Sequence, residues 1–212
     1  MFKNRLSRFF FDTFLARRRP TYERKRRSGL LTRVKIVVDS ALDIPNAALT
    51  EYGVVQVPVL VHWQGKEYKD KVDMAPDQMF KKFAEVPELP TTSQPASGEF
   101  ARVYKHLLQG ADVILSFHIA ASLSGTYNSA VAGAEIVKNP AIQVFDTNSV
   151  SMGGGLQALT AAKTLAAGGT WQEALASAEK VEERVMIHLV LDTLSNVLKG
   201  GRTRLEATLA HY

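Results

Sequence analysis

The sequence is built from a recurring unit: a short apolar strand rich in β-branched residues, a loop of Ser, Gly or Thr, and an apolar helix. Strands of this kind are predicted at 34–38, 113–119, 142–145 and 186–191, and helices at 47–52, 100–108, 130–137, 156–167 and 171–185. Parallel strands require a crossover of this length between them. The repeated unit therefore predicts an α/β fold with a mainly parallel sheet.

The segment between the first strand and residue 100 departs from this pattern. Residues 54–57 and 59–63 are predicted to be extended, and a helix is predicted at 75–84. Residues 88–98 contain two prolines and four hydroxyl side chains. This composition predicts a loop that leads into the N-terminus of a helix.

Positive charge is concentrated at the N-terminus. The first 35 residues carry 12 of the 26 Lys and Arg but only two of the 21 acidic residues, so the rest of the chain is net acidic. Basic runs at 17–19 and 24–27 follow a Phe cluster at 9–11, a composition that suits an anionic membrane surface or nucleic acid. We expect residues 1–33 to be a basic, disordered extension that makes at most transient contact with a membrane. The acidic body argues against a nucleic-acid partner.

The composition also limits the chemistry. The chain has no cysteine, so disulfides, iron–sulfur clusters, thiolate zinc sites and cysteine nucleophiles are excluded. None of its apolar runs approaches the roughly 20 residues that cross a bilayer. A chain of 212 residues can bury a sizeable core. These features predict a globular, cytoplasmic protein.

Two hydroxyl-rich loops are candidates for an anion site. Thr92–Ser93 and Ser124–Gly125–Thr126 each lead into a predicted helix, and loops of this kind gather at the carboxyl edge of a parallel sheet. Hydroxyl groups and helix N-terminal N–H groups there can bind one anion. A carboxylate fits better than a triphosphate because neither a P-loop lysine nor an acidic pair for magnesium accompanies the loops. The alternative is that these residues only cap helices.

Five segments carry a more specific signal through their order and spacing. They are Val34–Pro45, which contains Asp39–Ser40; Pro90–Pro95, which reads Pro-Thr-Thr-Ser-Gln-Pro; Leu123–Ala130, which begins Leu-Ser-Gly-Thr-Tyr; Asp146–Thr147; and Leu194–Arg202, which ends in Gly-Gly-Arg. Together they resemble the DegV family over about residue 34 to the end. The resemblance implies a two-lobed α/β protein that encloses a long-chain fatty acid, such as hexadecanoate, and presents it to a fatty acid kinase for acyl-phosphate formation and phospholipid synthesis.

The resemblance also implies site residues. The family's contacts to the fatty acid carboxylate fall on Thr92 and Ser124, with Ser93, Gly125 and Thr126 as helpers. Arg202 is then expected to contact the head group or the kinase. The protein would be a lipid carrier rather than an enzyme, with neither a metal nor a cofactor.

The sequence departs from the family pattern at several positions. Ala120–Ala121 stand where a serine pair commonly precedes the Leu-Ser-Gly motif, and Ala96 replaces a serine after Gln94–Pro95. Family members also usually continue beyond the length of this chain. We therefore expect an N-terminal α/β lobe at 34–155 and the start of an incomplete second α/β lobe at 156–212.

The main alternative is a phosphatase or hydrolase that uses Asp39 or Ser124. Asp39 and Asp43 are four residues apart, whereas a phosphatase Asp-x-Asp pair is two apart, and Asp43 is expected to cap the next helix. Ser124 lacks the Gly-x-Ser-x-Gly elbow of hydrolases. The glycines at 153–155 do not match the dinucleotide motif and are expected to form a flexible helix entry.

The histidines show no metal-ligand spacing and are expected to be packing or surface residues. Four of the five are His62, His106, His118 and His188. Among these, His118 lies just before the Ser124 loop.

Overall fold

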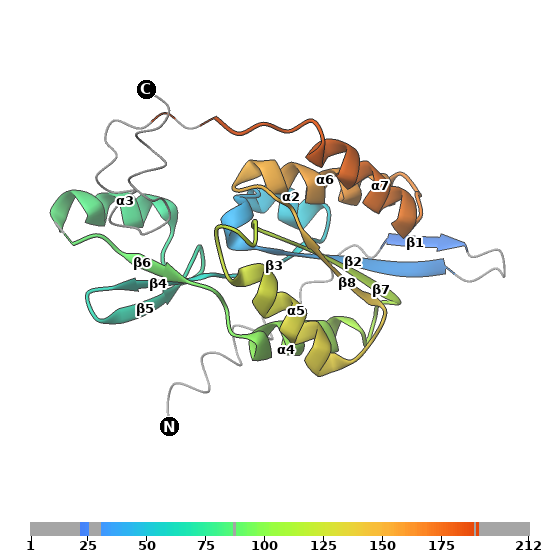
Figure 1. The fold of residues 1–212 in the computed structure, drawn as a ribbon, viewed down its shortest axis with the longest axis horizontal. Helices are drawn as coiled ribbons and strands as arrows, with labels where there is room; N and C mark the ends of the chain where they lie inside the picture. The colour runs from blue at the N-terminus through green and yellow to red at the C-terminus, as the bar shows by residue number, and fades with distance from the viewer. Residues whose placement is uncertain (1–21, 26–30, 87, 189, 191–212) are drawn as a thin grey trace.

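The computed structural model describes residues 22–25, 31–86, 88–188 and 190. Within them, a five-stranded sheet lies between two layers of helices, and a small three-stranded sheet lies beside it (Figure 1). The predicted α/β fold is confirmed.

The strands and helices have the following bounds. The large sheet contains β1 (Tyr22–Lys25), β2 (Leu31–Asp39), β3 (Val55–Val57), β7 (Val113–His118) and β8 (Ile142–Asp146). The small sheet contains β4 (Leu60–Trp63), β5 (Lys66–Lys69) and β6 (Thr91–Ser93). The helices are η1 (Ser40–Leu42), α2 (Asn46–Glu51), α3 (Pro76–Glu85), α4 (Ser97–Leu107), α5 (Thr126–Val137), α6 (Met152–Ala166) and α7 (Trp171–Glu182).

The large sheet is mainly parallel. Strands β3, β2, β7 and β8 are parallel neighbours in that order, and β1 pairs antiparallel with the beginning of β2. The register places Val37 beside Ser116 of β7, and His118 beside Asp146 of β8. The polar residues that end the central strands therefore lie at one edge of the sheet.

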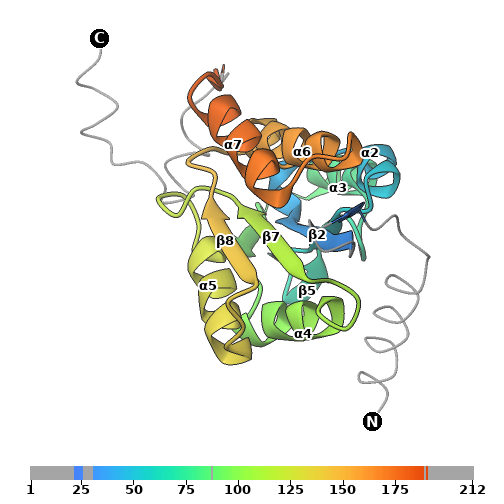
Figure 2. The ribbon, with the colours of Figure 1, turned by 90° about the vertical axis from the view of Figure 1, so that its right-hand side faces the viewer.

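Each face of the large sheet is covered by helices, as Figure 2 shows. Val34, Ile36 and Val38 of β2 belong to the apolar cluster that contains α6 and α7 residues, whereas Val37 belongs to the cluster with residues of α4 and α5. A strand buried on both faces needs apolar side chains at successive positions. This explains why these strands are continuous apolar runs rather than alternating patterns.

The glycines at 153–155 lie inside the first turn of α6, so the expected flexible helix entry is wrong. All three are buried. A Cβ on Gly154 would lie 2.6 Å from Thr147 Oγ1, and one on Gly155 would lie 2.6 Å from the carbonyl oxygen of Leu42. The glycines allow α6 to approach η1 and the end of β8 closely.

The small sheet is antiparallel, with the order β5-β4-β6. Helix α3 covers it through Phe83, whose ring centroid lies 5.1 Å from that of Trp63. Strand β6 falls in the segment predicted as a loop, and its pairing with β4 corrects that prediction. Three hydroxyl residues beside prolines resemble a loop, but β4 supplies a partner strand that a local pattern does not reveal.

Two further boundaries differ from expectation. Strand β1 and residues 31–33 of β2 lie within the segment predicted as a disordered extension. They form strands because they pair with each other. The strand predicted at 186–191 is wrong for the described residues, since Met186 to His188 and Val190 are not in a strand. Met186 is 75% exposed and Val190 is 97% exposed, so the described part of this segment is not buried as a central strand would be. The sequence also predicts a short apolar helix that ends at Leu198, and this segment lies outside the described residues.

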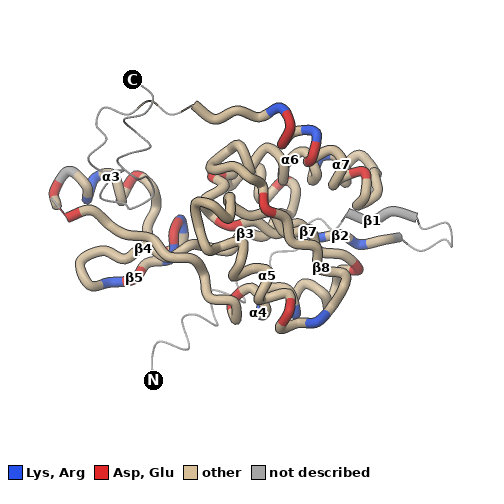
Figure 3. Tube along the Cα trace, in the orientation of Figure 1, with Lys and Arg blue, Asp and Glu red and all other residues tan. Residues whose placement is uncertain are grey.

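Charged residues of both signs lie on the helices and loops around the sheets (Figure 3). In the part of the chain that the structure covers, none of the helices has the length and hydropathy of a membrane span.

Candidate functional site

The structure brings the two hydroxyl-rich segments together. Gln94, which follows β6, lies against Gly125, which precedes α5. A Cβ added to Gly125 would lie 3.0 Å from the side-chain carbonyl carbon of Gln94. Since Gln94 is two residues from Thr92, and Gly125 adjoins Ser124, the predicted contacts come from adjacent segments.

Thr92 and Ser93 lie on β6, at the edge of the small sheet rather than at the end of a parallel strand. Thr92 pairs with Val61 of β4, and its side chain is exposed. The half-buried hydroxyl of Ser93 lies 2.7 Å from His62 Nε2 and forms a hydrogen bond with it. The strand pairing thus fixes both residues, and His62 orients Ser93.

Ser124 is held in the loop that follows β7. The carbonyl oxygen of Ala120 accepts hydrogen bonds from the N–H groups of Leu123 and Ser124, at 2.9 and 3.1 Å. The Ser124 hydroxyl lies 2.9 Å from the Thr126 hydroxyl and accepts a longer hydrogen bond, 3.3 Å, from the Thr126 N–H. Thr126 is fully buried, whereas Ser124 is half-buried. Thr126 therefore supports Ser124 from the inside.

Helices α4 and α5 both begin next to these segments. Their N-cap residues, Ala96 and Gly125, make no side-chain capping hydrogen bond. N–H groups in the first turn of a helix favour an anion, as does the helix dipole. The alternative expectation was that the hydroxyls only cap helices. One of them has this role in part, since Ser124 Oγ accepts a hydrogen bond from the N–H of Thr126, the first residue of α5.

Asp39 anchors a buried polar network at the ends of the central strands. Its Oδ2 accepts hydrogen bonds from the Ile119 N–H and from His118 Nδ1, both at 3.0 Å, and its Oδ1 accepts one from the Ala41 N–H at 2.9 Å. His118 Nε2 lies 2.7 Å from the Ser116 hydroxyl, which lies 2.9 Å from the hydroxyl of Tyr104 on α4. The side chains of this network are buried.

Asp39 and Asp43, the two candidates for a phosphatase site, have surroundings that differ from those of a phosphatase nucleophile. Asp39 is 0% exposed, and both of its oxygens already accept hydrogen bonds. Asp43 does not cap α2, whose N-cap is Pro45; instead it accepts a 2.6 Å hydrogen bond from Lys71 Nζ. The expected cap is wrong because Asp43 has a left-handed backbone, with φ of 50°.

Tyr104 gives the network a pH dependence. Burial raises the pKa of Tyr104 above its ordinary value of 10.0, although the hydrogen bond to Ser116 lowers it. Above about pH 10 the unfolded chain loses a proton that the folded chain keeps, so the stability that Tyr104 contributes is lost as the pH rises.

Tyr104→Phe tests this assignment. It removes the hydroxyl but keeps the ring, so at pH 7 we expect the free energy of unfolding to fall by about 1 kcal/mol. Above pH 10 the gap between wild type and variant should narrow, because only the wild type has this group to ionise. Urea unfolding at pH 7 and at high pH measures both values, and a gap that stays constant would contradict the assignment.

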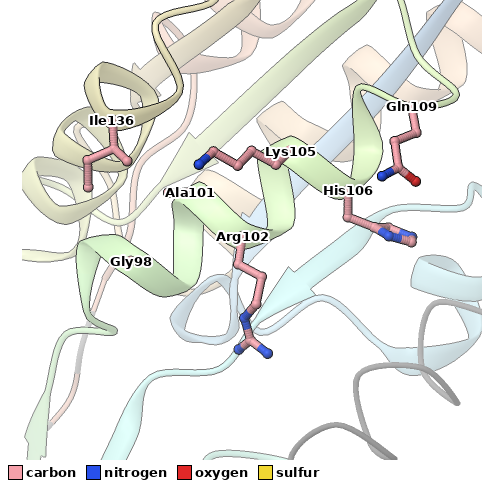
Figure 4. A pocket seen from close by; sticks show the side chains of 7 residues that line it. All are labelled: Gly98, Ala101, Arg102, Lys105, His106, Gln109 and Ile136. Atoms are coloured by element: carbon pink, nitrogen blue, oxygen red, sulfur yellow. The ribbon is translucent and has the colours of Figure 1, made fainter.

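Arg202 lies outside the described residues. A separate hollow of about 530 Å³ lies on the outer side of α4 (Figure 4). It is lined by Gly98, Ala101, Arg102, Lys105, His106, Gln109 and Ile136. None of the predicted carboxylate contacts lines this hollow. In the described residues, no group of three or more His, Cys, Asp or Glu side chains is arranged to hold a metal ion.

Sequence reasoning missed His62 and Gln94 as parts of the site. The bond of His62 to Ser93 depends on the pairing of β6 with β4, and the contact of Gln94 is with Gly125, in a loop about 30 residues later. The only signal in the sequence was the presence of Gln94 in the Thr-Ser-Gln-Pro segment. His118 is buried and packs against Phe100, as expected of a packing residue, and it also links Asp39 to Ser116 by hydrogen bonds that the sequence did not predict.

Comparison with known proteins identifies the family. The family model described as an uncharacterised protein of the DegV family matches residues 33–210. The chain belongs to the DegV family. A DegV domain-containing protein of Caldanaerobacter subterraneus is 32% identical over 172 residues, which are 81% of this chain and 61% of that protein. This chain therefore spans about three fifths of the length of that DegV relative.

Solved structures of fatty-acid-binding proteins share the fold. A fatty-acid-binding DegV protein of Thermus thermophilus superimposes with a TM-score of 0.74 at 35% identity, covering 85% of this chain and 64% of its own. A stearic acid-binding protein of Eubacterium ventriosum superimposes with a TM-score of 0.64 at 29% identity, covering 69% of this chain and 52% of its own.

Proposed function

We propose that the chain binds a long-chain fatty acid and that the hydroxyls of Thr92 and Ser124 hold its carboxylate. The observation that carries this is the contact of Gln94 with Gly125, which sets the two segments side by side. The fatty acids bound by the similar Thermus and Eubacterium proteins support the ligand class.

The hydrogen bonds around Ser124 suit this role. When the buried Thr126 hydroxyl donates to Ser124 Oγ, the Ser124 proton is left to donate to a ligand. A carboxylate accepts such bonds at both oxygens, and each charge-assisted bond contributes about 1.5–3 kcal/mol. Thr126 then supports Ser124, while Ser93, held by His62, and Gly125 shape the surroundings.

Exposed apolar side chains lie near the same loops. Leu123, beside Ser124, is 40% exposed, and Ile187 is 39% exposed. Ile187 packs on Gly153, next to the loop whose Ser149 carbonyl accepts a hydrogen bond from the Ala120 N–H. Burying the roughly 14 methylenes of hexadecanoate could supply on the order of 11 kcal/mol before ordering costs. In this proposal the tail supplies most of the affinity and the hydroxyls set its direction.

The proposal extends to a partner. A carboxylate held at the end of the sheet, with the tail inside, is presented outward to a fatty acid kinase for acyl-phosphate formation. Arg202 is our candidate contact for that kinase or for the head group, and such a complex belongs in the cytoplasm. Residues 34–155 would form the first lobe, and 156–212 would begin the second. The protein would then act as a carrier rather than an enzyme.

Native mass spectrometry of the purified chain, followed by titration of the delipidated chain, tests the function. We expect one acyl species per chain and one-to-one binding of hexadecanoate. Turnover of a nitrophenyl ester or phosphate without fatty acid binding would instead favour the hydrolase or phosphatase alternative, and would overturn the proposal. Deleting residues 1–21, which precede β1, should leave the fatty acid affinity unchanged.

A further inference from the structure

The turn at Asp39–Asp43, which we call the central turn, contacts both halves of the proposed site. It connects β2 with α2, and the proposed function leaves its polar groups without a role. One side of this turn touches the large sheet, and the other touches the small sheet.

On the large-sheet side, Asp39 fixes the start of the Ser124 loop. Its carboxylate accepts the hydrogen bond from the Ile119 N–H at 3.0 Å. The next residue, Ala120, accepts the bonds that close the loop at Leu123 and Ser124. Two consecutive residues, Ile119 and Ala120, therefore connect the central turn to Ser124 through their backbone hydrogen bonds.

On the small-sheet side, Ser40 and Asp43 hold two points. The Ser40 hydroxyl accepts a 3.0 Å hydrogen bond from the N–H of Val59, the residue just before β4. Lys71 Nζ, just beyond β5, donates to the Ser40 carbonyl oxygen at 2.7 Å and to the Asp43 carboxylate at 2.6 Å. Strand β4 pairs directly with β6, which carries Thr92.

Asp43 and Lys71 both have left-handed backbone, with φ of 50° and 60°. This conformation is uncommon for residues other than glycine and persists where the surrounding contacts determine it. The Lys71 side chain is only 17% exposed, whereas the Asp43 side chain is 50% exposed. The part-buried bond from Lys71 to the Ser40 carbonyl oxygen therefore joins the two sheets more firmly than the ion pair with Asp43, because exposed ion pairs contribute little.

We propose that the central turn and Lys71 set the separation of Thr92 and Ser124, and that Lys71 is a positioning residue for the carboxylate. This inference rests on the proposed function. A single carboxylate can accept from both hydroxyls only when each distance stays within about 3.2 Å, because hydrogen bonds weaken steeply outside that geometry. Loosening the junction should therefore weaken recognition of the head group and spare the tail.

Lys71→Met tests the inference because it removes the ammonium group and keeps an apolar stem. We expect the dissociation constant of hexadecanoate to rise about fivefold, as for one impaired charge-assisted hydrogen bond. The dissociation constant of hexadecanol, which lacks the carboxylate, should stay within about twofold. Lys66→Met, the same change at an exposed position of β5, is the matched control and should leave both values unchanged.

A double-mutant cycle with Thr92→Val separates positioning from direct contact. If Lys71 acts through Thr92, Lys71→Met has no further effect on hexadecanoate binding in the Thr92→Val background. An undiminished effect in that background would overturn the inference, as would equal losses for hexadecanoate and hexadecanol. If the wild type binds neither ligand, the proposed function fails; if it prefers hexadecanoate and Lys71→Met does not alter that preference, only the positioning role fails.

Discussion

Replacing Asp39 with asparagine is expected to lower the free energy of unfolding by about 3 kcal/mol, because the buried carboxylate accepts three N–H hydrogen bonds. An amide has one acceptor oxygen, so its NH2 group must face at least one N–H donor. His118 can reverse its tautomer and accept from the amide, since Ser116 can donate or accept. The N–H of Ile119 or of Ala41 then still lacks an acceptor.

Asp73→Asn is the matched control for this prediction. Asp73 is exposed, and its carboxylate accepts one hydrogen bond from the Lys69 N–H. We expect a loss below about 1 kcal/mol, as for other exposed charged contacts. Urea unfolding followed by circular dichroism measures both variants. Equal losses in the two variants would show that the Asp39 network does not hold the strand ends together.

Thr92→Val and Ser124→Ala are each expected to reduce the affinity for hexadecanoate about tenfold or more, because each removes a charge-assisted hydrogen bond. Their affinities for hexadecanol should change little, since the alcohol is held mainly by its tail. The fold should tolerate both changes, because Thr92 is exposed and Ser124 is half-buried. Titration of delipidated protein with the two ligands measures the difference.

Two neighbouring substitutions serve as controls for the site. Thr91→Val changes the adjacent residue of β6, whose side chain points to the opposite face of the strand. Ser122→Ala changes an exposed serine in the same loop as Ser124. Neither should affect hexadecanoate binding. If Thr91→Val weakened binding as much as Thr92→Val, the assignment of the carboxylate contact would be wrong.

The main elements of the fold followed from local patterns. The apolar runs at 34–38, 113–119 and 142–145 predicted strands because burial on both faces leaves little choice of side chain. The helix predicted at 156–167 ends close to the expected residue, at Ala166, although it begins earlier, at Met152. Strand β6 was missed because pairing with β4, some 30 residues earlier, decides its conformation. Local composition does not carry that information.

The candidate site was predictable in part. Hydroxyl-rich motifs singled out Thr92 and Ser124, but their relation in space depends on the junction of two sheets. The bond between His62 and Ser93 follows from strand register, and the bond between Asp39 and His118 joins residues 79 positions apart. Long-range polar contacts of this kind have no periodic signal in the sequence.

Hexadecanoate labelled with 13C at the carboxyl carbon tests the central claim most directly, since its NMR signal reports the surroundings of the head group. With the wild type we predict a bound signal distinct from that of free ligand. Thr92→Val and Ser124→Ala should each shift it, while Thr91→Val and Ser122→Ala should leave it in place. A bound signal that is identical in all five proteins would contradict the account.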